Sequence, residues 1–324
     1  SPANPVRLRV IDDVPAGFRA SEAVKPGTAV RIMTGAPIPD GADAIVPVEL
    51  TDAGTDIVSV SDSVPVGACF RRAGADVMAG SVVVRKGTEL TSRQVGVLAA
   101  VGQAEVSVHP RPRVIVISTG SELVEPGTPL TKGLITDSNS YMLVSAVQEA
   151  GAIAYRVGPI VDDDAAFMEA IEGQLHRADL IVTSGGVSMG AYDTVKAVLS
   201  TLGTVEFTKV LMHPGMPQGH GHVGERRTPI ITLPGNPVSS YVSFEVYVRP
   251  MIRALRGLAE VERPVMHAAC LTGFDSPPNK TQYMRGRLSG YEYATVEPVG
   301  ISGSHAIGGL AQANCLIVVP IDQG

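Results

Sequence analysis

The sequence predicts a multidomain protein in which a central α/β domain, built on a parallel sheet, lies between β-rich regions. Three short runs of β-branched and aliphatic residues carry this prediction, at 114–117, 180–182 and 230–232. Each run is followed by a loop rich in Gly, Ser or Pro and then by a helical pattern, the first only after a longer loop. Such alternation is typical of a parallel sheet that is covered by helices.

Residues 1–110 are expected to form a β-rich region of one or two subdomains. Short apolar runs separated by Gly and Pro punctuation predict strands there. The expected strands lie at 6–10, 44–46, 57–58 and 82–84.

A helix is expected over 91–101, because Thr91 and Gln94 form a capping-box pair and Gly102 ends the apolar stripe. The chain begins at Ser1 without a Met, in a polar stretch. We therefore expect the β-rich region to be incomplete at its N-terminal end.

The central α/β domain is expected to span residues 111–258. Its helices are predicted at 138–150, 163–177, 194–202 and 239–258, the last bent near Pro250. A small C-terminal β domain is expected over 262–324. Its strands are predicted at 265–271, 291–299 and 316–319.

Composition narrows the class of ligand. Trp is absent, aromatic residues make up 4% and the formal net charge is −6, which argues against binding to nucleic acid. No apolar run reaches membrane-spanning length. The three cysteines are far apart and form no disulfide framework or zinc spacing, so a reducing, cytoplasmic location is expected.

The loops after the three apolar runs, at 118–123, 183–190 and 233–239, are the expected binding site. If the runs are neighbouring parallel strands, these loops meet at the carboxyl edge of the sheet, where open α/β sheets bind ligands. The loops offer backbone N–H groups and hydroxyls with little side-chain bulk. That chemistry suits a phosphate or another oxyanion.

The order of several short motifs resembles the MoeA family of molybdopterin molybdenumtransferases, which includes the E domain of gephyrin. In the central domain the resemblance rests on 118–123, 137–139, 183–190 with Asp193, and 234–239. Upstream it rests on 34–36 followed by 41–46, and on 71–76. It therefore covers essentially the whole chain and implies a molybdopterin-binding central domain.

The resemblance implies a transferase that inserts molybdenum from molybdate into adenylylated molybdopterin and releases AMP, which completes molybdenum cofactor biosynthesis. It also implies Mg²⁺ as the assisting cation and a homodimer. A molybdopterin adenylyltransferase and apo-molybdoenzymes are possible protein partners. No nucleic-acid or membrane partner is expected.

The resemblance also implies the residues of the site. The candidate catalytic residues are Glu122, Asp193, Asp162, Asp76, Thr34 and Lys209. Carboxylate oxygens suit Mg²⁺, and the candidate metal ligands are Glu122, Asp193 and Asp162. The candidate substrate-binding residues are Ser118, Thr119, Gly120, Ser121, Asp137, Asn139, Ser184, Gly185, Gly186, Ser188, Gly190, Pro234, Gly235, Asn236, Pro237 and Ser239.

Plain structural roles compete with these assignments. Glu122 has an alternative reading as a carboxylate in the first turn of a helix, although the resemblance favours a functional role, and Asp193 could also be a helix N-cap. Asp162, Asp163 and Asp164 precede a helix together, so one of them caps it and the choice of Asp162 as the functional one stays open.

Some positions depart from the family pattern. His213 and Met216 stand where relatives commonly have lysines, and we expect a protonated His213 to compensate in part at mildly acidic pH. Ala75 replaces an acidic residue, and the N-terminal Met-Asp-Gly-Tyr-Ala type motif is not found in the sequence. From the resemblance we also expect the last strands of the family to follow residue 324.

Two further patterns are discounted. The glycine pattern at 219–224 lacks the strand and helix of a dinucleotide-binding motif. His213, His220 and His222 lack acidic or Cys partners nearby and are expected to be loop residues rather than zinc ligands.

Three alternatives stay open. A molybdopterin adenylyltransferase resembles residues 113–256 alone, although the extra β domains argue against it. A non-enzymatic scaffold or binding protein of the same fold is the second, and a relative that has lost activity is the third.

Overall fold

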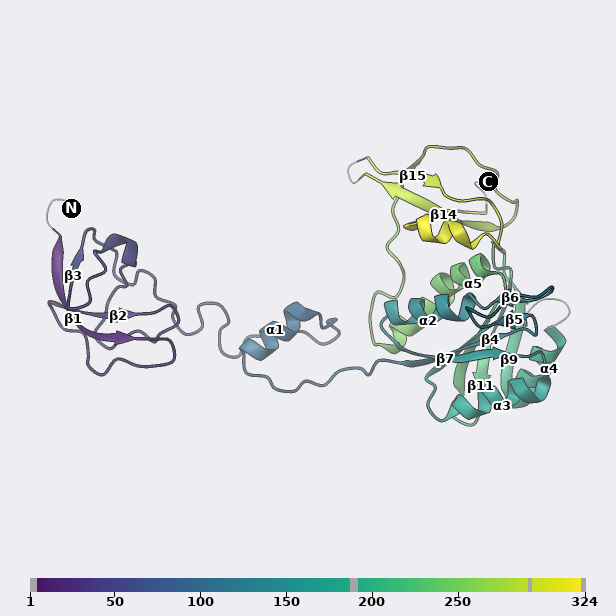
Figure 1. Ribbon diagram of the computed structural model, residues 1–324, viewed down its shortest axis with the longest axis horizontal. Coiled ribbons are helices and arrows are strands. Elements are labelled where there is room, and N and C mark those ends of the chain that lie inside the picture. Colours follow the sequence, from purple (N-terminus) through teal and green to yellow (C-terminus); the bar gives the residue numbers. More distant parts are fainter. Residues whose placement is uncertain (1–4, 187–191, 291–292, 322–324) are drawn as a thin grey trace. The chain divides into compact units, whose positions relative to one another are not determined.

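Figure 1 shows the computed structural model, which describes residues 5–186, 192–290 and 293–321. The chain folds as two compact units, residues 1–84 and 85–324. No helix in the described part of the chain is long and apolar enough to cross a membrane.

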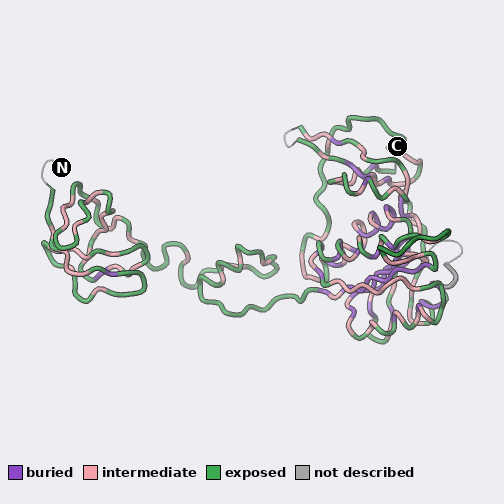
Figure 2. Tube along the Cα trace, viewed as in Figure 1, coloured by how far each residue is buried: buried purple, intermediate pink, exposed green. Residues whose placement is uncertain are grey.

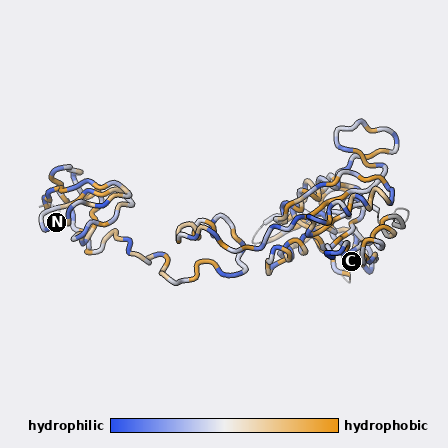
Figure 3. The backbone as a smooth tube through the Cα atoms, turned by 90° about the horizontal axis from the view of Figure 1, so that it is seen from below, coloured by the Kyte–Doolittle hydropathy of each residue, from blue (hydrophilic) through white to orange (hydrophobic). Residues whose placement is uncertain are grey.

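The first unit is built on a three-stranded sheet with the order β2-β1-β3. Strand β1 (Val6–Val14) pairs in parallel with β2 (Thr28–Ile32) and antiparallel with β3 (Ile57–Val60). A short 3₁₀ helix, η1 (Val48–Leu50), lies between β2 and β3. Hydrophobic residues occur throughout this unit (Figure 3), but few of them are buried (Figure 2).

Two of the four strands expected here are confirmed, within β1 and β3, and two are wrong. Residues 44–46 are irregular, since Ile45 N–H donates to Ala68 O and no ladder follows. Residues 82–84 form a bend without a partner strand. A β-branched run makes a strand only where a neighbouring segment supplies its hydrogen bonds.

The second unit begins with helix α1 (Ser92–Ala100), which confirms the predicted helix. The reciprocal capping box between Thr91 and Gln94 is present, and Gly102 has a φ of +80° just after the last turn. Arg256 of the central domain holds this segment through a 2.8 Å bond to Glu89.

The central sheet has six strands in the order β7-β4-β8-β12-β11-β9. The four parallel strands are β7 (Ile153–Ile160), β4 (Arg113–Thr119), β8 (Leu180–Ser184) and β12 (Thr228–Leu233). The sheet is mixed, because β11 (Pro217–Val223) pairs antiparallel with both β12 and β9 (Gly203–Lys209). The prediction of a purely parallel sheet is therefore corrected at this edge.

Strand β11 was not predicted from the sequence. Residues 219–224 and the two histidines at 220 and 222 were expected in loops, but residues 217–223 are a strand. Glycine has low β-propensity. The glycines are required here by close packing, since a Cβ on Gly221 would lie 1.9 Å from Thr204 O and one on Gly219 2.1 Å from Thr232 Oγ1.

Successive residues of β4 enter two different cores, one on each face of the sheet. Val114 and Val116 pack on one face, with α2 (Asn139–Glu149) and the helical segment that contains Phe244 and Ile252. Ile115 and Ile117 pack on the other face, with α3 (Asp164–Leu175) and α4 (Tyr192–Leu202). Figures 1 and 2 show the helices on both faces and the buried stretches within the strands.

The predicted helix at 239–258 is three consecutive segments. These are α5 (Pro237–Ser243), the π-helical η2 (Phe244–Val248) and α6 (Arg249–Leu255). Pro250 lies in the first turn of α6, where its missing N–H is tolerated. The expected break near Pro250 is thus spread over the five residues before α6.

The C-terminal part forms a second sheet with the order β10-β14-β15-β13, and β16 pairs with β14. Its strands are β10 (Met212–His213), β13 (Ala269–Cys270), β14 (Thr281–Ser289), β15 (Thr295–Pro298) and β16 (Cys315–Val319). A 3₁₀ helix, η3 (Ile307–Gln312), precedes β16. Strand β14 was missed by the sequence analysis, and 265–271 contributes only the two residues of β13.

Candidate functional site

The loops that follow β4, β8 and β12 meet at the carboxyl edge of the central sheet, as the sequence predicts. Gly185 N–H donates to Leu233 O over 3.2 Å. A Cβ placed on Gly185 would lie 2.3 Å from Thr119 O, and one on Gly235 would lie 3.6 Å from Gly185 Cα. The three loops are thus in van der Waals contact, and glycine at position 185 permits that approach.

Asn139 connects two of these loops from the first turn of α2. Its Nδ2 donates to Ser184 Oγ at 2.9 Å and to Gly235 O at 2.7 Å. Ser184 Oγ in turn lies 3.4 Å from Ser240 Oγ in α5. One side chain therefore fixes the spacing of the loops after β8 and β12.

Two polar atoms at this convergence are buried and without a partner among the described residues: Thr119 Oγ1 and Asn139 Oδ1. Thr119 is 6% exposed, and its hydroxyl lies beside the loop of Gly185 and Gly186. Buried polar groups in folded proteins are almost always hydrogen-bonded. These two atoms are accordingly suited to a polar ligand.

A carboxylate pair borders the turn after β4. Ser121 N–H donates to Asp162 Oδ2 over 3.3 Å, and Asp162 N–H donates to Ser121 Oγ over 3.0 Å. Glu122 folds back over Gly120, so that a Cβ on Gly120 would lie 2.7 Å from Glu122 Oε2. The turn thus holds Glu122 and Asp162 on one exposed rim.

The structure separates the three consecutive aspartates. Asp163 is the N-cap of α3 and accepts a 2.9 Å bond from Ala166 N–H, while Asp164 lies in the first helical turn. Asp162 instead contacts the turn at Ser121. The helix reading of Glu122 is wrong, because the residues after it enter strand β5 (Leu123–Val124).

Asp137 lies between the loops in a buried polar network. It is 1% exposed. Its carboxylate accepts bonds from Ser118 Oγ at 2.6 Å, from Ser140 Oγ at 2.6 Å and from Ser140 N–H at 3.1 Å. Arg156 Nη2 lies 3.3 Å from the same carboxylate. The network holds the end of β4 against the start of α2.

Sequence reasoning missed most of this network. Arg156 Nη2 also contacts Glu125 Oε1 at 2.7 Å, and Tyr141 OH donates to Glu125 Oε2 at 2.8 Å. The bonds from Arg156 and Tyr141 hold the pKa of Glu125 below its usual value, and the bond to Glu125 raises the pKa of Tyr141. The only signal in the sequence was an arginine inside the otherwise apolar strand 153–160.

The loop after β12 leads directly into α5. The helix begins at Pro237 rather than at Ser239, and its N-cap Asn236 makes no side-chain cap bond. Ser304 O of the C-terminal part accepts a 2.9 Å bond from Val238 N–H, and Ser239 is 4% exposed. The predicted start of this helix at residue 239 is therefore corrected to Pro237.

The remaining predicted residues are dispersed. Thr34 follows β2 and Asp76 lies in a bend, both exposed in the first unit. Lys209 is exposed at the carboxyl end of β9, two strands from β12 at the same edge of the sheet. Ser188, Gly190 and the side chain of Asp193 lie outside the described residues.

His213 does not provide the expected positive charge. Burial lowers the pKa of His213, and the nearby Lys280 lowers it further. The lowered pKa argues against the expected compensation at mildly acidic pH, because this imidazole is neutral over a wider pH range than a free one. No group of three His, Cys, Asp or Glu residues in the described ranges is arranged to hold a metal ion.

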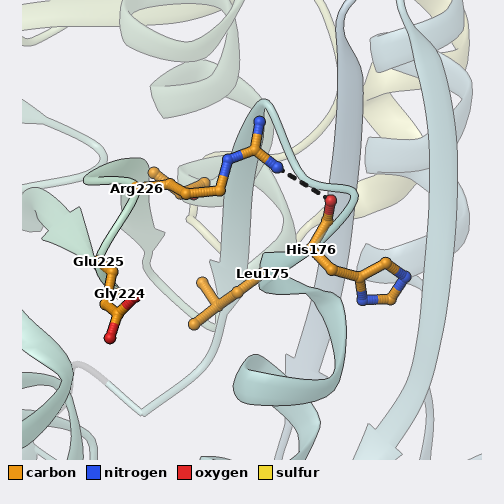
Figure 4. Close-up of a pocket in the computed structure, with 6 residues that line it drawn as sticks. Leu175, His176, Gly224, Glu225 and Arg226 are labelled. Carbon is orange, nitrogen blue, oxygen red and sulfur yellow. Dashed lines mark hydrogen bonds between the residues drawn. The ribbon is translucent and has the colours of Figure 1, made fainter.

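A separate hollow of about 260 Å³ lies near Thr228, at the start of β12 (Figure 4). It is lined by Leu175, His176, Gly224, Glu225, Arg226 and Thr228. Arg226 Nη1 donates to His176 O across it at 3.0 Å. This hollow is at the amino edge of the sheet, opposite the three loops, and shares none of the candidate site residues.

Comparison with known families gives three matches in chain order. The MoeA N-terminal region (domain I and II) matches residues 2–102, a probable molybdopterin binding domain matches 115–254, and the MoeA C-terminal region (domain IV) matches 267–324.

Curated relatives and solved structures agree with these matches. Molybdopterin molybdenumtransferase 2 of Mycobacterium tuberculosis is 48% identical over 99% of this chain and 80% of its own length. Molybdopterin molybdenumtransferase of Bacillus subtilis is 37% identical over 98% and 75%. A crystal structure of a molybdopterin biosynthesis MoeA protein from Pyrococcus horikoshii superposes with a TM-score of 0.76, at 31% identity over 99% and 78%. The chain therefore belongs to the MoeA family.

Proposed function

We propose that this protein is a molybdopterin molybdenumtransferase, which inserts molybdenum from molybdate into adenylylated molybdopterin and releases AMP. The observation that carries the proposal is the convergence of three loops around Asn139 at the carboxyl edge of the sheet. The curated relatives described above are named for this activity, and their similarity extends over nearly the whole chain. Both facts support the same assignment here.

The loops would hold the anionic parts of the substrates. Ser118, Thr119, Gly120 and Ser121 lie on one side, and Ser184, Gly185 and Gly186 on the other. The loop of Pro234, Gly235, Asn236 and Pro237 completes the rim, and Ser188, Gly190 and Ser239 are assigned to it on the family resemblance alone. Preorganised N–H and hydroxyl donors stabilise developing charge without reorganisation. Placing molybdate close to the dithiolene group of molybdopterin would lower the entropic part of the reaction barrier.

Mg²⁺ would bind on the rim formed by Glu122 and Asp162, with Asp193 as the third proposed carboxylate. Mg²⁺ is commonly held by one or two carboxylates together with substrate phosphates and waters, and the two described carboxylates meet that requirement. When bound, it would offset the charge of the phosphoanhydride. Lys209 at the same edge of the sheet would add a cation for the phosphates.

The proposal extends to the assembly. In this scheme Thr34 and Asp76 act from the first unit of a homodimer, across the subunit boundary. The protein would work in the cytoplasm, receiving its substrate from a molybdopterin adenylyltransferase and passing its product to apo-molybdoenzymes. The support for these points is the family resemblance.

Nucleotide release tests the function. Purified protein would be given adenylylated molybdopterin, Mg²⁺ and molybdate, beside a parallel reaction with molybdopterin and ATP. Molybdate-dependent AMP release, with reconstitution of an apo-molybdoenzyme by the product, is expected. Pyrophosphate release from ATP would instead indicate the adenylyltransferase. If neither AMP nor pyrophosphate is released, a binding or scaffold role is what remains.

A further inference from the structure

The loop that carries Glu122 is attached to the sheet at two points. It leaves the sheet after β4, forms a small parallel pair of strands, β5 (Leu123–Val124) and β6 (Ile135–Thr136), and returns at Asp137. Ile135 N–H donates to Glu122 O over 2.9 Å, so the position of Glu122 depends on the placement of this pair. What holds the pair to the rest of the fold therefore contributes to the position of Glu122, together with the bonds between Ser121 and Asp162.

Arg156 of β7 makes one such attachment, beside the bonds from Ser118 Oγ to Asp137 and from Tyr141 OH to Glu125. In the register of the pair, Leu123 lies opposite Ile135 and Val124 opposite Thr136, so Glu125 and Asp137 are the next residues on each strand. Arg156 Nη2 contacts Glu125 Oε1 at 2.7 Å and Asp137 Oδ2 at 3.3 Å. One guanidinium thus joins the residues that directly follow both strands.

The same guanidinium reaches the start of α2. Arg156 Nε donates to Ser140 Oγ over 2.6 Å, and its Cζ lies 4.2 Å from the centre of the Tyr141 ring. Ser140 and Tyr141 directly follow Asn139, which spaces the loops after β8 and β12. Arg156 is therefore in contact with the segment that follows Glu122 and with the residues that follow Asn139.

The strength of these contacts follows from burial and geometry. The Arg156 side chain is 22% exposed, that of Asp137 is 0% and that of Glu125 is 46%, so the contact with Asp137 is the buried one. A planar guanidinium directs several donors in fixed directions, which a lysine ammonium cannot reproduce. Removing one partner of a buried charged network leaves the other charge uncompensated.

We propose that Arg156 is a positioning residue of the molybdenum-transfer site, which fixes the Glu122 rim relative to Asn139 through Glu125, Asp137 and Ser140. The inference rests on the proposed function and on Glu122 as a Mg²⁺ ligand. Residues that orient metal ligands typically contribute about 10- to 100-fold to metal affinity or activity. Arg156 acts without touching substrate or metal itself.

The test uses Arg156→Met, Arg156→Lys and the matched control Arg113→Met. Arg113 is a comparably paired arginine of the same sheet, joined to Asp179 through contacts of 3.1 Å, but it begins β4 at the opposite edge. The first readout is amide hydrogen exchange over residues 121–140 without any substrate. The second is AMP release as a function of Mg²⁺ concentration.

We expect Arg156→Met to speed exchange across 121–140 and to raise the half-saturating Mg²⁺ concentration about 10- to 100-fold, with excess Mg²⁺ restoring much of the rate. Arg156→Lys should fall between wild type and Arg156→Met. Arg113→Met should change neither readout. If Arg156→Met fails to fold, Glu125→Gln provides the same test with a smaller effect, because it weakens one of the three contacts.

Two outcomes would overturn the proposal. One is unchanged exchange in the loop, and the other is faster exchange with the half-saturating Mg²⁺ concentration of wild type, which would make Arg156 purely structural. Absence of AMP release from the wild-type protein would refute the proposed function instead. In that case the exchange measurement still reports whether Arg156 holds the loop.

Discussion

A single methyl group at Gly185 should separate the loops of the candidate site. Gly185 has a φ of +100°, a conformation that L side chains rarely adopt. A Cβ there would lie 2.3 Å from Thr119 O and 2.9 Å from Thr119 Oγ1, whereas ordinary van der Waals contact begins at 3.4 Å. Gly185→Ala therefore forces the loop after β8 away from the loop after β4 by about 1 Å.

The magnitude follows from two costs. The positive φ costs about 1–2 kcal/mol for a residue with a Cβ, and overpacking a filled site costs about 1–3 kcal/mol. We expect the free energy of unfolding to fall by about 2–5 kcal/mol. A displacement of about 1 Å in a catalytic geometry typically lowers the rate about 100-fold, so AMP release should fall by roughly that factor.

The assay combines urea unfolding with steady-state AMP release. Gly173→Ala is the matched control, because Gly173 is exposed in α3 and nothing lies within 4 Å of the added Cβ. It should stabilise the protein by about 0.5–1 kcal/mol and leave the rate unchanged. Wild-type stability and rate in Gly185→Ala would refute the close contact of the loops.

Three further predictions concern other parts of the second unit. Arg113 lowers the pKa of Asp179 below its ordinary value of 3.8, so this pair stabilises the fold fully above pH 3.8 and less as the pH falls through the folded pKa. In Asp179→Asn the free energy of unfolding should therefore depend less on pH in this acidic range. The same pH dependence in the variant as in the wild type would contradict the assignment. Asn139→Ala removes two bonds between loops and should lower kcat/KM about 10- to 100-fold with a loss of about 1–2 kcal/mol in unfolding free energy, measured by the same two assays. Because burial lowers the pKa of His213, His213→Gln should show the wild-type rate at every pH from about 6.5 to 8, and a rate lost only in the variant at the acid end would contradict this.

Strands β4, β8 and β12 of the central sheet were predictable because they carry strong local signals. Residues 114–117, 180–182 and 230–232 are short aliphatic runs between polar punctuation, and all of them are buried or nearly so in the sheet. Their loops then had to meet at one edge, since parallel neighbours share a direction. The placement of Thr119, Gly185 and Gly235 in contact follows from that topology alone.

Other elements depend on contacts that no local pattern encodes. Strand β11 is made of residues with weak β-propensity, and its glycines are needed only because Thr204 and Thr232 pass so close. The strands expected at 44–46 and 82–84 fail for the opposite reason, since no neighbouring segment pairs with them. Tertiary pairing decided both cases against local propensity.

The polar network of the site could not be predicted from the sequence, because it also depends on tertiary contacts. Arg156 and Asp137 are 19 residues apart, and their meeting depends on the path of the chain through β5, β6 and α2. Asp163, rather than Asp162, caps α3 because only its carboxylate reaches Ala166 N–H. Side-chain partners of this kind follow from three-dimensional placement.

The most direct test of the account is a crystal structure with adenylylated molybdopterin bound. The account predicts density for the ligand at the carboxyl edge of the central sheet, with its phosphates against the loops of Thr119, Gly185 and Gly235 and with Thr119 Oγ1 hydrogen-bonded to it. Density at the opposite edge, near Thr228 and Arg226, with the three loops free of ligand, would contradict it.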